Sequence, residues 1–151
     1  MSGNSEVIST LNGLISACRD GQHGFATAAD AAESAELKSL FTTYSQQRAA
    51  FAGELRDEVR RLGGEAADSG SVTGAVHRGW MEVKAAATGR DDASILEECE
   101  RGEGAALASY RSALGVDMPA GVRAIVERQF TEVKQAHERM TSMRRASGAG
   151  A

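Results

Sequence analysis

Four long segments of this chain repeat apolar residues at steps of three and four, the period of an amphipathic α-helix. Each segment also carries one polar residue inside its apolar stripe, namely Gln22, Arg48, Glu103 and His137. The buried face of a bundle helix is normally apolar, and metal sites of helical bundles are built from side chains that project inward from facing helices. The matched set therefore predicts either a metal site or a group of side chains that has replaced one.

The four segments have clear start and stop signals. Ser34 is a suitable N-cap for the second segment, Gly63-Gly64 ends it, and Asp91 or Asp92 can cap the third. Helices of ~22–28 residues are ~33–42 Å long, which suits a bundle. The expected helices are Ser5 to Ala32, Ala35 to Leu62, Ala93 to Leu114 and Ala120 to Arg145.

The connections predict the topology. Short turns near Glu33 and Asp117 make two antiparallel hairpins, and between them lie a polar loop, 65–71, and a shorter predicted helix, 72–87. This connection is long enough to run the length of the bundle. We expect an all-α fold: a ferritin-like four-helix bundle with two antiparallel hairpins and a crossover containing a short extra helix. The alternative makes the crossover helix a fifth core element. Residues 1–146 are expected to form one domain and 147–151 a flexible tail.

Composition narrows the class of protein. Apolar residues make up 42% and charged residues 25%, which is typical of a globular chain. The net charge is −4 with acids and bases interspersed, so nucleic acid is not an expected partner. The apolar runs are too short to span a membrane, and the N-terminus lacks the features of a signal peptide, so a cytoplasmic location is expected. Cys18 and Cys99 fall on apolar stripes and are expected to be buried thiols outside any disulfide.

The four polar residues are expected to lie at one level of the bundle. Counted from the predicted helix ends, their depths agree within ~6 Å at 1.5 Å per residue. A buried guanidinium or carboxylate without a partner is strongly unfavourable, so Arg48 and Glu103 should pair. Gln22, His137 and Gln129 would then complete the hydrogen bonds. This metal-free polar core layer is the preferred interpretation, and the alternatives are a retained metal site and exposure of some of these residues.

A metal site is the alternative. Di-iron bundles need one Glu from each of two helices and a Glu-x-x-His pair from each of the other two. Here Arg48 introduces a permanent cation, and Lys134 stands three residues before His137 where a Glu would be required. If a metal binds, the ligands would be Glu54, Glu103 and His137, with iron or another divalent metal as the ion.

Two further polar features are interpreted as surface. Asp20 and His23 have a spacing that could hold a metal on one helix face, but we expect a surface pair because that face is opposite the apolar stripe. The sequence Arg144-Arg145-Ala146-Ser147 resembles a basophilic kinase site, and a solvated tail is preferred.

Several segments together resemble an uncharacterised bacterial family of ferritin-like four-helix-bundle proteins, grouped as a domain of unknown function. The resemblance covers about residues 8 to 143 and implies a ferritin-like fold, but it implies no established activity. The segments that carry it are Leu11-Asn12-Gly13-Leu14-Ile15, Asp20-Gly21, Gln47-Arg48, Glu54-Leu55, Leu62-Gly63-Gly64, His77-Arg78-Gly79-Trp80 and Glu97-Glu98-Cys99-Glu100-Arg101-Gly102-Glu103.

Two functions remain open from the sequence. The first is a non-enzymatic bundle that acts through assembly or partner binding, with a homo-oligomer or another protein as the partner. Trp80 is the possible partner anchor, although packing that seals the bundle is the preferred interpretation of this side chain. The alternative is a di-iron oxidase or iron-handling protein of the ferritin and rubrerythrin type. No nucleophile triad, phosphate-binding loop or pair of catalytic acids is recognisable, so no catalytic residue is assigned and no cofactor is expected under the first reading.

Overall fold

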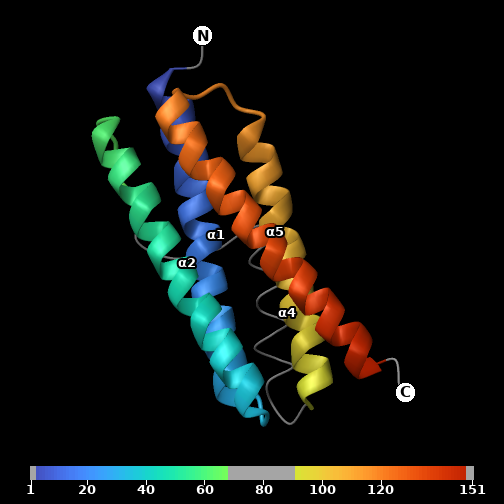
Figure 1. Ribbon diagram of the computed structural model, residues 1–151. Coiled ribbons are helices and arrows are strands. Elements are labelled where there is room, and N and C mark those ends of the chain that lie inside the picture. Colours follow the sequence, from blue (N-terminus) through green and yellow to red (C-terminus); the bar gives the residue numbers. More distant parts are fainter. Residues whose placement is uncertain (1–2, 68–90, 149–151) are drawn as a thin grey trace.

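The computed structural model describes residues 3–67 and 91–148, and this part of the chain is all-helical without strands (Figure 1). Most helix ends lie within one residue of the expected positions. The exception is the last helix, which ends at Gly148 rather than at Arg145. The expected crossover helix at 72–87 lies outside the described residues. The helices are α1 (Asn4–Ala31), α2 (Ala35–Arg61), α4 (Asp92–Leu114) and α5 (Ala120–Gly148).

The predicted capping residues make the expected contacts. The Ser34 hydroxyl accepts the N–H of Leu37 at 3.3 Å, and the Asp91 carboxylate accepts the N–H of Ser94 at 2.9 Å. At the other end of α2, Gly63 has φ +86°, a left-handed conformation that glycine adopts without strain. The amide of Gly64 then donates to the carbonyl of Val59 at 2.9 Å and satisfies a terminal backbone group of α2.

A single side chain joins the two hairpins at one end of the bundle. Both carboxylate oxygens of Asp92 accept backbone N–H groups of the α1–α2 turn, from Glu33 at 2.8 Å and from Ser34 at 2.9 Å. The start of α4 therefore lies beside the start of α2, and these two helices run in the same direction (Figure 1). The arrangement is that of a four-helix bundle made of two antiparallel hairpins.

The core consists of two apolar clusters stacked along the bundle axis. On α2, Leu37 and Phe41 belong to the cluster near the α1–α2 turn, while Phe51 and Leu55 belong to the other. On α4 the division falls between Cys99 and residues 106–107. Helix packing is closest within each hairpin, less extensive between α1 and α4, and slight between α2 and α5. The sequence positions at which the cluster changes are those of Arg48 and Glu103.

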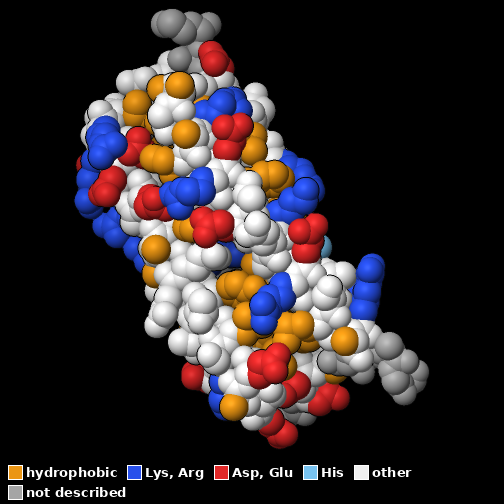
Figure 2. Space-filling view, in the orientation of Figure 1, with side chains coloured by type: hydrophobic (Ala, Val, Ile, Leu, Met, Phe, Trp, Pro, Cys, Tyr) orange, Lys and Arg blue, Asp and Glu red, His pale blue; other side chains and the backbone are white. Residues whose placement is uncertain are grey.

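The surface is charged and mixed in sign. On the face shown in Figure 2, acidic and basic side chains are interspersed, without a continuous basic stripe. Among the described helices, none has the length and apolar character needed to cross a membrane.

Candidate functional site

The centre of the bundle holds an ion pair between α2 and α4. Arg48 is 1% exposed and Glu103 is 0% exposed. The guanidinium contacts the carboxylate in bidentate fashion, with Nη1 on Oε1 and with Nη2 donating to Oε2 at 2.5 Å. The third donor group, Nε of Arg48, reaches the side-chain oxygen of Gln47 at 3.3 Å. The planar fork of arginine matches a carboxylate in this way, whereas lysine offers only a point charge.

Aromatic rings complete the surroundings of Arg48. Its Cζ atom lies 5.4 Å from the ring centroid of Phe25 and 5.9 Å from that of Phe51, within cation–π range. Burial alone would lower the pKa of Arg48, but the adjacent Glu103 carboxylate outweighs burial and raises the pKa. The guanidinium is therefore protonated throughout the pH range in which proteins fold. The site is thus a paired charge inside an apolar and aromatic shell.

The structure does not bring Gln22 and His137 into this contact. Gln22 is half-buried, and its side-chain oxygen accepts from Arg19 at 2.9 Å. His137 is also half-buried, and its ring lies near Gly104. Of the four residues predicted to form one layer, the structure brings Arg48 and Glu103 into direct contact. Gln22 and His137 are half-buried at the edges of their stripes, where hydrogen bonding to neighbours at the surface is available.

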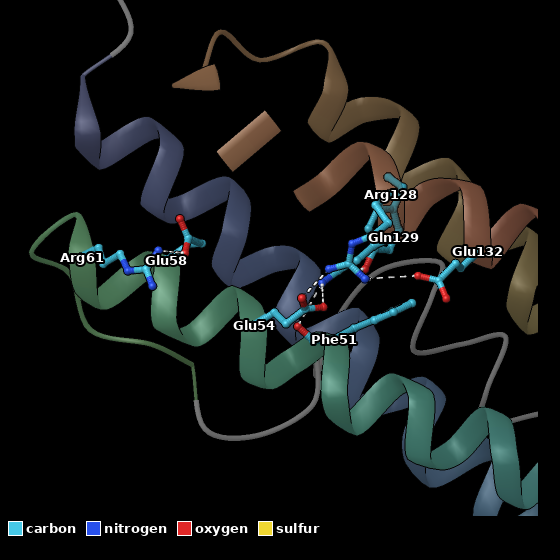
Figure 3. Close-up of polar contacts among 8 residues, drawn as sticks. Phe51, Glu54, Glu58, Arg61, Arg128, Gln129 and Glu132 are labelled. Atoms are coloured by element: carbon cyan, nitrogen blue, oxygen red, sulfur yellow. Dashed lines mark hydrogen bonds and ion pairs between the residues drawn. The ribbon is translucent and has the colours of Figure 1, made fainter. Parts of the chain in front are cut away.

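A second polar group, missed as a unit in the sequence, bridges α2 and α5 (Figure 3). Gln129 is 0% exposed and donates to the carbonyl of Phe51 at 3.3 Å and to Oε1 of Glu54 at 3.1 Å. Arg128 forms an ion pair with the other oxygen of Glu54 and a weaker one with Glu132 at 3.3 Å. Gln129 stands on the stripe between Val126 and Val133 and was expected to hydrogen-bond within the polar layer, but its partners on α2 were not predicted.

Gln129 connects this bridge to a buried thiol. The Tyr110 hydroxyl donates to the side-chain oxygen of Gln129 at 2.7 Å and lies 3.2 Å from the Cys18 sulfur. The single phenolic proton is used toward Gln129, so the thiol of Cys18 must be the donor in the second contact. The chain of donors runs from Cys18 to Tyr110, Gln129 and Glu54, and it passes through all four described helices.

Burial makes these groups poor acids. It raises the pKa of Cys18 to about 11, with the Tyr110 hydrogen bond acting weakly in the opposite direction. Burial also raises the pKa of Tyr110 and of Cys99 well above their ordinary values. Both cysteines are buried and outside any disulfide, as expected. Because the thiolate is the reactive form, neither thiol is activated as a nucleophile.

The three candidate metal ligands lie in different contacts. Glu103 is paired with Arg48, Glu54 is held by Arg128 and Gln129, and His137 lies near Glu100. Within residues 3–67 and 91–148, no three His, Cys, Asp or Glu side chains are grouped in a way that could hold a metal ion. The described side chains therefore offer no ready coordination sphere.

The remaining candidates have separate outcomes. Trp80 and the segment around it lie outside the described residues. The expected surface pair is half wrong, because His23 is exposed whereas Asp20 is 8% exposed. Arg144 at the start of the kinase-like sequence contacts Glu100 on α4, so this part of α5 is packed against its neighbour.

A family model described as Domain of unknown function (DUF2383) matches residues 6–115, which cover nearly all of α1 and the whole of α2 and α4. Arg48, Glu103, Cys18 and Tyr110 all fall within the matched region. The search of curated proteins found no match.

Proposed function

The chain belongs to the family described as Domain of unknown function (DUF2383), and from the closed centre of its bundle we propose that it is a structural or partner-binding helical protein without metal-dependent catalysis. The observation that carries this proposal is the buried pair of Arg48 and Glu103. A carboxylate at the centre of a bundle is the typical ligand of a di-iron site. Here it is already neutralised by a guanidinium, which cannot ligate and repels cations.

The proposal extends to the topology and the setting of the protein. Two antiparallel hairpins whose second and third helices run parallel are the arrangement that one long crossover produces in ferritin-like folds. We therefore propose a ferritin-like bundle in which the ion pair stands in the place of a metal. The mixed surface charge and the absence of a spanning helix in the described part are compatible with a cytoplasmic location.

The competing function is a di-iron oxidase or iron-handling protein that uses Glu54, Glu103 and His137. Each of these residues would have to leave or share its present contacts, and Arg48 would have to turn away from the bundle centre. A measurement of iron chemistry separates the two functions directly. Purified protein would first be analysed for bound metal, then loaded with Fe(II) without oxygen, and finally exposed to oxygen.

The proposed function predicts no stoichiometric iron and no oxidation above that of a buffer blank. The matched variant is Glu103→Gln, which keeps the shape of the side chain and removes its charge. Bound iron in whole-number stoichiometry, with oxygen consumption that disappears in Glu103→Gln, would refute the proposal and establish the di-iron alternative.

A further inference from the structure

We propose that Asn12–Gly13 is a deamidation site, and that the contact of Asn12 with the segment that follows α2 controls when the reaction occurs. This segment, residues 64–67, is called the strap. Asn12 binds the backbone of the strap at two points: Nδ2 donates to the carbonyl of Glu65 at 2.9 Å, and Oδ1 accepts the N–H of Ala67 at 2.8 Å. The inference goes beyond the proposed function and does not depend on it.

The strap fits closely against α1. A Cβ atom added to Gly64 would lie 2.8 Å from side-chain atoms of Ile8, so the strap approaches α1 to a distance that only glycine allows. Ala66 and Ala67 are half-buried and pack against the same core cluster as Ile8. Both ends of the Asn12 carboxamide are therefore engaged within a packed contact, and its orientation is fixed.

Glycine at position 13 has a chemical consequence where packing does not require it. Gly13 is exposed, and no described atom lies within 4 Å of a Cβ built on it. Inside a helix, glycine is also less favourable than alanine. Asparagine is one of the thermally labile residues, and a following glycine leaves the next backbone nitrogen without a side chain that would hinder its attack. Asn12–Gly13 is thus the sequence in which deamidation is sterically easiest.

The reaction needs water and no other reactant. The backbone nitrogen of Gly13 attacks Cγ of Asn12, the bond between Cγ and Nδ2 breaks, and Nδ2 leaves as ammonia with the proton of the Gly13 amide. Water then opens the cyclic imide and gives aspartate or isoaspartate at position 12. Both products lack the N–H donor. In the aspartate, a carboxylate oxygen would face the carbonyl oxygen of Glu65, and these two acceptors repel each other.

The fold protects the site in two ways. The amide of Gly13 belongs to the helical backbone of α1, and the strap holds the carboxamide of Asn12. The reactive state therefore requires local opening of the helix together with release of the strap. After the reaction the strap no longer finds its donor, and the side chain of Ile8 loses its cover. The modification is a one-way record of opening at this end of the bundle.

The rate of deamidation tests the role of the strap. The protein would be incubated in mildly alkaline buffer, and the conversion of Asn12 would be followed by mass spectrometry of its proteolytic peptide. The variant Gly64→Ala pushes the strap away from Ile8 and should speed the conversion on the order of 10-fold, the factor that corresponds to the net strength of one lost hydrogen bond. Gly13→Ala should suppress the conversion, because its methyl group hinders the attacking nitrogen.

The matched control is Asp92→Ala, which weakens the opposite end of the bundle. Its rate should stay within about twofold of that of the unaltered protein, because the opening is local. Equal acceleration by Gly64→Ala and Asp92→Ala would show that the reaction requires global unfolding, and would overturn the proposal. An unchanged rate in Gly64→Ala would overturn it as well.

A second measurement uses no variant. Deamidated protein would be produced by incubation in urea, refolded, and separated from the unmodified chain by ion exchange through its additional negative charge. Hydrogen exchange at the amide of Ala67 should then be on the order of 10-fold faster than in the unmodified protein, because the strap is released. Unchanged exchange at this amide, or no conversion of Asn12 in urea, would refute the proposal.

Discussion

The replacement of Arg48 by Met tests whether the ion pair at the bundle centre determines stability. Methionine has similar length and is apolar, so the aromatic shell of Phe25 and Phe51 can still be filled. The Glu103 carboxylate, which is 0% exposed, would then have no cationic partner. A double variant, Arg48→Met with Glu103→Leu, removes both charges and leaves an apolar core of similar volume.

The expected magnitude follows from burial on both sides of the pair. Breaking a buried pair by removing one partner destabilises by about 3–5 kcal/mol, a large part of the ~5–15 kcal/mol total of a typical domain. With a urea m-value of ~2 kcal/mol per M, the midpoint should fall by about 2 M. The double variant should recover most of the loss, because replacement of both charges by packed apolar groups is often neutral.

Urea unfolding followed by circular dichroism would measure the wild type, both single variants and the double variant. The matched control is Glu132→Met, because Glu132 pairs at the surface with Arg128 at 3.3 Å, and the two side chains are 36% and 49% exposed. Its effect should stay within about 0.5 kcal/mol. If the two core substitutions add within about 0.5 kcal/mol, the pair is not coupled and the reasoning is refuted.

Three further predictions concern the hydrogen-bond chain and the junction of the hairpins. Burial raises the pKa of Cys18 from 9.0 to about 11, so the folded state keeps a proton that the unfolded chain releases. The free energy of unfolding should therefore be constant below about pH 9 and fall by up to ~3 kcal/mol between about pH 9 and 11. Urea unfolding at each pH should show a smaller fall for Cys18→Ala, and an unchanged fall would contradict this. Tyr110→Phe should destabilise the fold by ~1–3 kcal/mol, because it leaves the buried partners of the Tyr110 hydroxyl unsatisfied. The control Tyr44→Phe, at a half-buried position, should be nearly neutral in the same assay. Equal effects of the two substitutions would argue against the hydrogen-bond chain. Asp92→Ala should lower the free energy of unfolding by ~1–2 kcal/mol and speed hydrogen exchange at the amide of Ser34. Unchanged exchange at this amide would show that the contact between Asp92 and the α1–α2 turn is not maintained in solution.

The helices were predictable because the signals that set them are local. Ser34, Asp91 and Gly63 act within a few residues of their own position, and each makes the expected terminal contact. The role of Asp92 was not predictable, because its carboxylate oxygens accept backbone N–H groups of a turn that is distant in sequence. The end of α5 was also missed, since no proline or strong capping residue precedes the tail.

The sequence predicted how far along its helix each polar residue lies, but not whether its side chain points into the core. The residue count along each helix predicted that Gln22 and His137 lie at the level of Arg48. In the structure the Gln22 carbonyl accepts from the Ser45 hydroxyl at 2.8 Å, and the His137 ring lies near Gly104. An apolar stripe is about 100° wide, so the sequence alone does not distinguish its centre from its edge. Ala136, next to His137, occupies the buried position on α5 instead. Hydroxyl and amide groups gave the weakest signal, because Tyr110 reads as an apolar stripe residue until its partner is known.

The charge at the centre of each inner face also bears on how the chain avoids aggregation while it folds. The α1–α2 hairpin leaves the ribosome first and must wait for α4 and α5 before its apolar face is covered. During that interval the hydrated guanidinium of Arg48 lies in the middle of this face. Burial against an arbitrary apolar surface would desolvate the cation without providing a carboxylate partner. The same penalty protects the α4–α5 hairpin through Glu103. The two charges that pair in the folded bundle thus also make each separate hairpin a poor partner for other unfolded chains.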